Sequence, residues 1–143
     1  MRVSLSLGAS MVKYLIKNRV LLRKRFPLVL MLEVTHLCNL ACEGCGRIRE
    51  YRETMRQMLS MEECMRAVDE CPAPVVTVTG GEPLMHPEID KIINGILERK
   101  RHIYLCTNGI LLPEILKKLN PSKYLNINVH IDGLAKIHDA IAG

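Results

Sequence analysis

The stretch PLVLMLEVTHLCNLACEGCG (residues 27–46) joins an apolar run to a loop that is rich in cysteine. The run LVLMLEVTH is short, largely aliphatic and preceded by Pro27, which is typical of a buried strand. Cys38, Cys42 and Cys45 follow it with the spacing C-x₃-C-x₂-C. The stretch therefore predicts a strand whose carboxyl end opens directly into a loop of thiols.

Strand-type and helix-type segments alternate along the rest of the chain. Strand patterns cover residues 28–36, 74–80, 102–107 and 124–133, and helix patterns follow at residues 60–71, 87–100, 112–119 and from Leu134 onward. Ser60 and Glu63 form a capping box at the start of the first of these helices. Alternation with short turns favours parallel strands joined by right-handed crossovers. The sequence predicts an α/β fold with a parallel sheet and about four βα units.

A glycine-rich or polar turn follows each predicted strand. These turns are the cysteine loop, GGEP (residues 80–83), TNG (residues 107–109) and DG (residues 132–133). In parallel α/β folds the loops at the carboxyl ends of the strands carry the chemistry. We therefore expect these turns to meet at one rim and form a site.

Three thiols in one loop suit an iron–sulfur cluster better than a structural zinc ion. Structural zinc takes four protein ligands, usually from two separated pairs, and no second pair follows the loop. His36 is a candidate fourth ligand, whereas Cys64 and Cys71 on a predicted helix are interpreted as core residues. A four-iron cluster with three thiolate ligands keeps one iron open for a substrate or cofactor. A zinc module and a non-catalytic iron–sulfur module remain the alternatives.

The pair of motifs CNLACEGC and GGEP resembles the radical S-adenosylmethionine (radical SAM) superfamily. The resemblance implies a partial (β/α) barrel with a [4Fe–4S] cluster and SAM as cofactors. One electron from the cluster would cleave SAM to methionine and a 5′-deoxyadenosyl radical. The implied cluster ligands are Cys38, Cys42 and Cys45, and the implied contacts to the SAM amino group are Gly80, Gly81 and Glu82.

Three polar residues on the same rim are further candidates for contacts with SAM or substrate. Asn108 lies in the TNG turn, and His130 and Asp132 are expected on the same strand face as Asn128. A plain tight turn and a structural histidine are the alternative interpretations.

A longer resemblance covers nearly the whole chain. Residues 27–46, 74–90, 103–109 and 128–133, together with the basic N-terminal arm, look like the adenosyl-hopene transferase branch of the radical SAM enzymes. The resemblance implies addition of the 5′-deoxyadenosyl radical to the double bond of hopene, a membrane triterpene, in hopanoid biosynthesis. It also implies a reductant such as a flavodoxin or ferredoxin.

Addition of a radical to an alkene leaves a carbon radical that needs a hydrogen atom. Cys106 ends a predicted strand on the expected rim, and we interpret its thiol as the catalytic hydrogen-atom donor. The alternative is a small residue buried in a strand, which is common for free cysteine.

Basic residues are concentrated at the start of the chain. Residues 1–32 carry seven Lys or Arg side chains and no acid, whereas the remainder carries 13 basic and 15 acidic side chains. We divide the chain into a basic arm (residues 1–26) and an incomplete radical SAM core domain (residues 27–143). Residues 11–25 have the pattern of a basic, loosely amphipathic helix, which either lies on an anionic membrane surface or packs on the domain. Aromatic residues are few and no binding motif accompanies the arm, so nucleic acid is not expected as a partner.

The sequence predicts a cytoplasmic protein that is at most peripheral on the inner membrane surface. No apolar run is long enough to span a bilayer, and no secretory leader with a cleavage site begins the chain. In such a compartment the six cysteines are not expected to form a disulfide framework.

Two features depart from the family pattern. Gly44 stands before the third cysteine, where many radical SAM proteins carry an aromatic residue near the adenine. The predicted βα units also fall short of the family's barrel, and residues 124–131 would form an open apolar edge. We expect either an inactive fragment of a longer enzyme or a chain that a second polypeptide completes.

Overall fold

Four parallel strands form one sheet in the computed structural model, which describes residues 5–46 and 52–142. They are β1 (Val29–Thr35), β2 (Val75–Gly80), β3 (His102–Thr107) and β4 (Leu125–Val129), and each pairs with the next in chain order. Sequential parallel strands are the arrangement of barrel-type α/β folds. The prediction of a parallel α/β fold with four βα units after a basic helix is confirmed.

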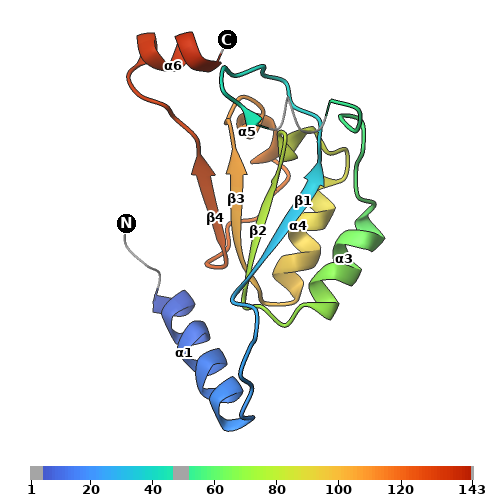
Figure 1. Cartoon of the computed structure of the whole chain (residues 1–143), viewed down its shortest axis with the longest axis vertical. Coiled ribbons are helices and arrows are strands. Elements are labelled where there is room, and N and C mark those ends of the chain that lie inside the picture. Colours follow the sequence, from blue (N-terminus) through green and yellow to red (C-terminus); the bar gives the residue numbers. More distant parts are fainter. Residues whose placement is uncertain (1–4, 47–51, 143) are drawn as a thin grey trace.

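α3 and α4 cover one face of this sheet (Figure 1). The elements that follow the strands are α3 (Met61–Glu70) after β1, the 3₁₀ turn η1 (Pro83–Met85) and α4 (Ile89–Glu98) after β2, α5 (Leu112–Ile115) after β3, and α6 (Ala135–Ala142) after β4. α3 and α4 contact each other, and they also contact β1 and β3, respectively. The hydrophobic core therefore lies between these two helices and the sheet.

Alternation along the strands decides which side chains enter this core. Strand residues alternate between the two faces of a sheet, whereas helix residues return to one face every three or four positions. The buried strand residues are Leu32, Val34, Val76, Val78, Ile103 and Leu105, and the helices contribute Cys64, Val68, Ile92, Ile93 and Ile96. The apolar residues of the predicted strands thus form the core, as their pattern indicates.

The start of α3 follows the predicted capping box. The Ser60 hydroxyl accepts a hydrogen bond from the amide of Glu63 at 3.2 Å, and the Glu63 carboxylate accepts one from the amide of Ser60 at 2.7 Å. Cys64 is fully buried, which confirms its interpretation as a core residue. Cys71 is a half-buried residue at the end of the helix, so the same interpretation is wrong for it.

The other face of the sheet carries the alternate residues and leads toward the cysteine loop. The parallel register places Met31, Thr77, Tyr104 and Asn126 in one row, and Cys106 beside Asn128 in a row nearer the carboxyl edge. We call this surface the open face. Met31 is 66% exposed there, so the open face offers apolar as well as polar groups.

α1 (Leu5–Val20) packs at the amino ends of the strands, opposite the end that carries the cysteine loop (Figure 1). Leu7 and Asn18 are buried, and the Ser10 hydroxyl lies 3.2 Å from Nε2 of His102 at the start of β3. None of the helices in the described part of the chain is long and apolar enough to cross a membrane.

The predicted bounds of the N-terminal helix are wrong at both ends. The helix begins at Leu5 and ends at Val20 instead of covering residues 11–25. Leu22 adopts a left-handed φ of 52°, and the amide of Arg23 donates to the carbonyl of Asn18 at 3.0 Å, which closes the helix. The basic run after Val20 therefore turns back toward the sheet.

Candidate cofactor site at the carboxyl edge of the sheet

The segments at the carboxyl ends of the four strands surround one cavity of about 390 Å³. We call it the rim cavity. Of the residues predicted for the site, those that line it are Cys38, Cys42, Cys45, Gly80, Gly81, Glu82, Cys106, Asn108 and His130. The cysteine loop, GGEP and TNG therefore meet at one rim as expected, whereas the predicted DG turn does not line the cavity. Asp132 is not part of the lining.

The cysteine loop places its three thiols along this cavity. Cys38, Cys42 and Cys45 are half-buried free cysteines, and they also line an adjoining cavity of about 340 Å³. The amide of Cys45 donates to the carbonyl of Cys42 at 3.2 Å, which holds the loop in a tight turn. His36 also lines the adjoining cavity, and its Nδ1 lies 3.1 Å from the carbonyl oxygen of Thr54.

The thiols do not converge on one point. In the described residues, no three His, Cys, Asp or Glu side chains come together as ligands of a single metal ion. In an iron–sulfur cluster each thiolate binds its own iron, so separated thiols along one cavity are compatible with a cluster.

Burial raises the pKa of the Cys38 thiol. The negative charges of Glu82, Cys42 and Cys45 raise this pKa further, whereas a hydrogen bond with the backbone of Leu40 lowers it. Ligation requires the thiolate, so metal binding at this loop releases protons and supplies the positive charge that favours the thiolate form.

Glu82 joins the GGEP turn to the end of β3. Its carboxylate is buried and accepts hydrogen bonds from the Thr107 hydroxyl at 2.8 Å, the Asn108 amide at 2.8 Å and the Leu84 amide at 3.0 Å. Two of these donors belong to TNG, so the two turns are held at a fixed distance. The carboxylate lines the rim cavity, and its predicted contact with the SAM amino group stays a prediction.

The two glycines of GGEP bring this turn against the exit of β1. A Cβ on Gly81 would lie 2.2 Å from the carbonyl oxygen of Leu37, and one on Gly80 would lie 2.3 Å from that of Thr35. The amide of Gly81 donates to Thr35 O at 2.8 Å, and the amide of Glu82 donates to Leu37 O at 2.6 Å. Close backbone approach thus requires glycine at both positions, whatever their predicted contacts with SAM.

Asn108 connects TNG to the cysteine loop. Its Nδ2 donates to Oδ1 of Asn39 at 2.8 Å, directly beside Cys38 in the sequence. Sequence reasoning identified Asn108 but missed Asn39 and Thr107, which hold the turns together. The sequence shows Asn39 and Thr107 only as polar residues inside the cysteine loop and TNG. A hydrogen bond between two loops that are distant in the sequence produces no local pattern that would reveal it.

His130 lines the rim cavity together with Asn128, as expected, whereas Asp132 does not. β4 ends at Val129, and the amide of His130 donates to the carbonyl of Thr107 at 3.0 Å. His130 Nε2 lies 2.8 Å from Oδ1 of Asp132, whose Oδ2 lies 3.4 Å from Nδ1 of His138. The prediction therefore agrees with the structure for His130. It is wrong for Asp132, because β4 ends at Val129 and Asp132 pairs with the two histidines outside the cavity lining.

Cys106 is half-buried, precedes the last residue of β3 and lines the rim cavity. Its partner in the parallel register is Asn128 of β4, which lines the same cavity. The structure therefore brings Cys106 to the same cavity as the loop thiols and the GGEP turn.

Comparison with known proteins gives a consistent result. The model of the radical SAM superfamily matches residues 32–143. Mycofactocin maturase MftC from Mycolicibacterium smegmatis is 30% identical over 122 residues, which cover 82% of this chain and 31% of that protein. AdoMet-dependent heme synthase from Methanosarcina barkeri is 33% identical, with 82% of this chain and 35% of that protein covered.

Solved structures agree with this assignment. The crystal structure of Streptococcus suis SuiB bound to S-adenosylmethionine matches with a TM-score of 0.70 and 25% identity, and covers 91% of this chain and 31% of SuiB. The chain spans about a third of the length of the relatives that it matches.

The superfamily uses a [4Fe–4S] cluster and SAM, and the described residues fit both groups. Half-buried thiols from one loop supply the donor type that iron–sulfur clusters take. The GGEP turn lines the same cavity beside these thiols through Gly80, Gly81 and Glu82. Because the matched region contains every one of these features, the chain belongs to the radical SAM superfamily.

Proposed function

We propose that the protein is a radical SAM enzyme whose cofactors meet in the rim cavity and whose substrate binds along the open face of the sheet. The observation that carries this proposal is the single cavity lined by Cys38, Cys42, Cys45 and the GGEP turn. A metal module without catalysis needs only the thiols, whereas a site that cleaves SAM also needs a wall that holds SAM beside the cluster, and the GGEP turn lines the same cavity.

Different residues of the rim cavity would hold the cluster and SAM. Cys38, Cys42 and Cys45 would each hold one iron, and the backbone of Gly80 and Gly81 would face SAM. When bound, the reduced cluster supplies the electron that splits SAM into methionine and a 5′-deoxyadenosyl radical. Glu82 fixes the GGEP turn to β3 and adds negative charge at the cavity wall, which suits the positively charged amino group of SAM.

For the substrate we propose an alkene in a hopene-type isoprenoid lipid, to which the 5′-deoxyadenosyl group is added. The support is the long sequence resemblance to adenosyl-hopene transferases and the apolar character of the open face near Met31 and Val29, which are 66% and 45% exposed. The relatives named above have activities that differ from one another, so the similarity to them does not identify the substrate of this protein.

Cys106 is the proposed hydrogen-atom donor for this addition. The 5′ carbon would form a bond to one alkene carbon, which leaves an unpaired electron on the other. The Cys106 S–H bond would then break, and its hydrogen atom would complete the product and leave a thiyl radical. One electron from a flavodoxin- or ferredoxin-type reductant and one proton from water would restore the thiol. Its place on the rim cavity supports this role.

Anaerobic reconstitution tests the proposal. The protein should bind about four irons with an equal amount of labile sulfide, and after reduction it should release 5′-deoxyadenosine from SAM. Cys42→Ala should lose the iron, whereas Cys71→Ala, at the end of α3, should retain it. Bound zinc without labile sulfide, or an iron–sulfur cluster that never yields 5′-deoxyadenosine, would refute the proposal in favour of a zinc or a non-catalytic module.

A further inference from the structure

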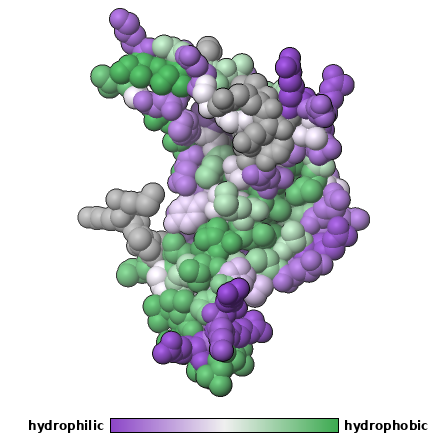
Figure 2. Space-filling view, viewed as in Figure 1, coloured by the Kyte–Doolittle hydropathy of each residue, from purple (hydrophilic) through white to green (hydrophobic). Residues whose placement is uncertain are grey.

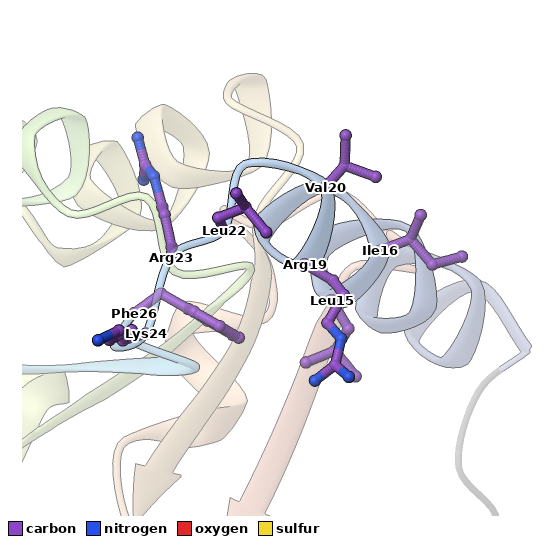
Figure 3. A pocket seen from close by; sticks show the side chains of 8 residues that line it. All are labelled: Leu15, Ile16, Arg19, Val20, Leu22, Arg23, Lys24 and Phe26. Atoms are coloured by element: carbon purple, nitrogen blue, oxygen red, sulfur yellow. The ribbon is translucent and has the colours of Figure 1, made fainter.

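The N-terminal arm forms a hydrophobic groove with a basic rim. The groove has a volume of about 990 Å³ and is lined by Leu15, Ile16, Arg19, Val20, Leu22, Arg23, Lys24 and Phe26 (Figure 3). We call it the arm groove. It lies at the amino ends of the strands, so it is separate from the rim cavity at their carboxyl ends (Figure 1).

Large apolar side chains of the arm groove are exposed to solvent. Ile16 is 59% exposed, Val20 74% and Leu22 87%. Figure 3 shows Ile16 and Val20 projecting away from the body of α1, and Figure 2 shows hydrophobic groups gathered over this end of the molecule. Exposed apolar groups that form a contiguous surface indicate an interaction site, unlike apolar residues that are exposed singly.

The opposite side of the arm is anchored to the domain. Leu7 and Asn18 are buried, and the Tyr14 hydroxyl donates to the carbonyl of Pro27 at 2.8 Å. The Tyr14 and Phe26 rings meet edge to face with centroids 5.7 Å apart. The arm therefore presents its apolar side chains from a folded support, which agrees with the interpretation of a helix that packs on the domain.

Charge identifies the kind of partner that this surface fits. Residues 1–32 carry seven basic side chains and no acid, and Arg19, Arg23 and Lys24 stand at the groove itself. The rest of the chain has a net charge of −2, since it carries 13 basic and 15 acidic side chains. Apolar side chains surrounded by Lys and Arg match an interface between acyl chains and anionic headgroups.

We propose that the arm groove docks the protein on an anionic lipid bilayer. Ile16, Val20 and Leu22 would enter the headgroup region, while Arg19, Arg23 and Lys24 would bind lipid phosphates. The rim cavity would lie at the end of the sheet that is farther from the bilayer. This docking depends on the arm alone, so its failure and the failure of the proposed chemistry are separate results.

Sedimentation with vesicles tests the docking without any cofactor. The full chain should pellet with vesicles of phosphatidylcholine mixed with phosphatidylglycerol and should stay in solution with pure phosphatidylcholine. Val20→Glu should abolish binding, whereas Leu134→Glu, which adds the same charge at a position that is 83% exposed near α6, should not.

A second pair of double variants tests how much the basic side chains of the arm groove contribute to vesicle binding. Arg19→Gln combined with Arg23→Gln should lower the partition coefficient roughly thirtyfold, because each basic residue near an anionic surface contributes about 1 kcal/mol. Lys117→Gln combined with Lys118→Gln should change it little. Circular dichroism should show the same fold in all variants.

Either of two results would overturn the proposed docking. The full chain would fail to sediment with anionic vesicles, or the arm variants would bind these vesicles as well as the unmodified chain does. Light scattering of the unmodified chain would then distinguish a second copy from another protein as the occupant of the arm groove.

Discussion

The hydroxyl of Thr107 donates a hydrogen bond of 2.8 Å to the buried carboxylate of Glu82. This contact joins the end of β3 to the GGEP turn after β2, and the Asn108 amide adds a second bond of 2.8 Å to the same carboxylate. The rim cavity therefore depends on one acidic side chain whose oxygens are occupied by donors from the protein.

Glu82→Gln should destabilise the protein although it preserves size. One carboxylate oxygen becomes an NH₂ group, which would face an amide or hydroxyl donor and leave a buried donor without an acceptor. A loss of about 1–3 kcal/mol in the free energy of unfolding is expected, measured by urea denaturation. Glu88→Gln, on the exposed side of the same segment, is the control. Equal stability of the Glu82→Gln variant would contradict the structural role of the carboxylate.

Gly81→Ala should disrupt the site more than its small size suggests. The new Cβ would lie 2.2 Å from the backbone oxygen of Leu37, so the GGEP turn must move away from the cysteine loop. The expected result is a loss of iron incorporation during reconstitution, measured as iron per chain. Gly8→Ala is the matched control, because nothing lies within 4 Å of its Cβ, and in α1 it should stabilise the protein by about 0.5–1 kcal/mol. Normal iron content in Gly81→Ala would rule out this account of the glycine.

Cys106→Ala and Cys106→Ser test the proposed hydrogen-atom donor. Both variants should still release 5′-deoxyadenosine from SAM, because Cys106 is not a cluster ligand in this account. Both should lose the reduced adenosylated lipid, since neither a methyl group nor a hydroxyl replaces a thiol as a hydrogen-atom donor. Mass spectrometry of the products measures this loss. Unchanged formation of the reduced product in either variant would show that the hydrogen atom comes from elsewhere.

His102 should make the fold sensitive to acid. Burial lowers its pKa below 6.5, nearby Lys123 lowers it further, and a hydrogen bond with the backbone of Ser6 acts in the opposite direction. Below pH 6.5 the unfolded chain therefore binds more protons at this residue than the folded chain does, and stability falls as the pH falls.

The slope from this residue is at most about 1.4 kcal/mol per pH unit. Urea denaturation on either side of pH 6.5 should show that His102→Gln loses part of this slope. His130→Gln, with an exposed side chain, should keep it. Identical slopes in the unmodified chain and in His102→Gln would mean that His102 does not resist protonation in the folded state.

The elements with strong local patterns were predictable from the sequence. β3 was predicted with its observed bounds because HIYLCT is flanked by charged residues and by TNG. The start of α3 was predictable from the capping box that Ser60 forms with Glu63. The cysteine loop was recognisable because its three thiols lie close together in the sequence, and GGEP was recognisable through the family resemblance. The topology of parallel strands brings both segments to one rim.

The features set by distant contacts were not predictable in this way. Leu22 closes α1 through a left-handed conformation that a leucine rarely adopts, so the basic run that follows looked helical. β4 ends at Val129 although the alternation of YLNINVHI continues past it, and Asp132 pairs with His130 outside the lining of the rim cavity. Asn39 and Asn108 are 69 residues apart in the sequence, and only the folded sheet brings them together.

The central claim is that SAM binds at the iron–sulfur cluster held by Cys38, Cys42 and Cys45. Electron paramagnetic resonance of the reduced, reconstituted protein tests it most directly when spectra are recorded with and without SAM. We predict a changed signal with SAM, because its amino and carboxylate groups would ligate the open iron. A cluster spectrum that is identical with and without SAM would contradict the claim.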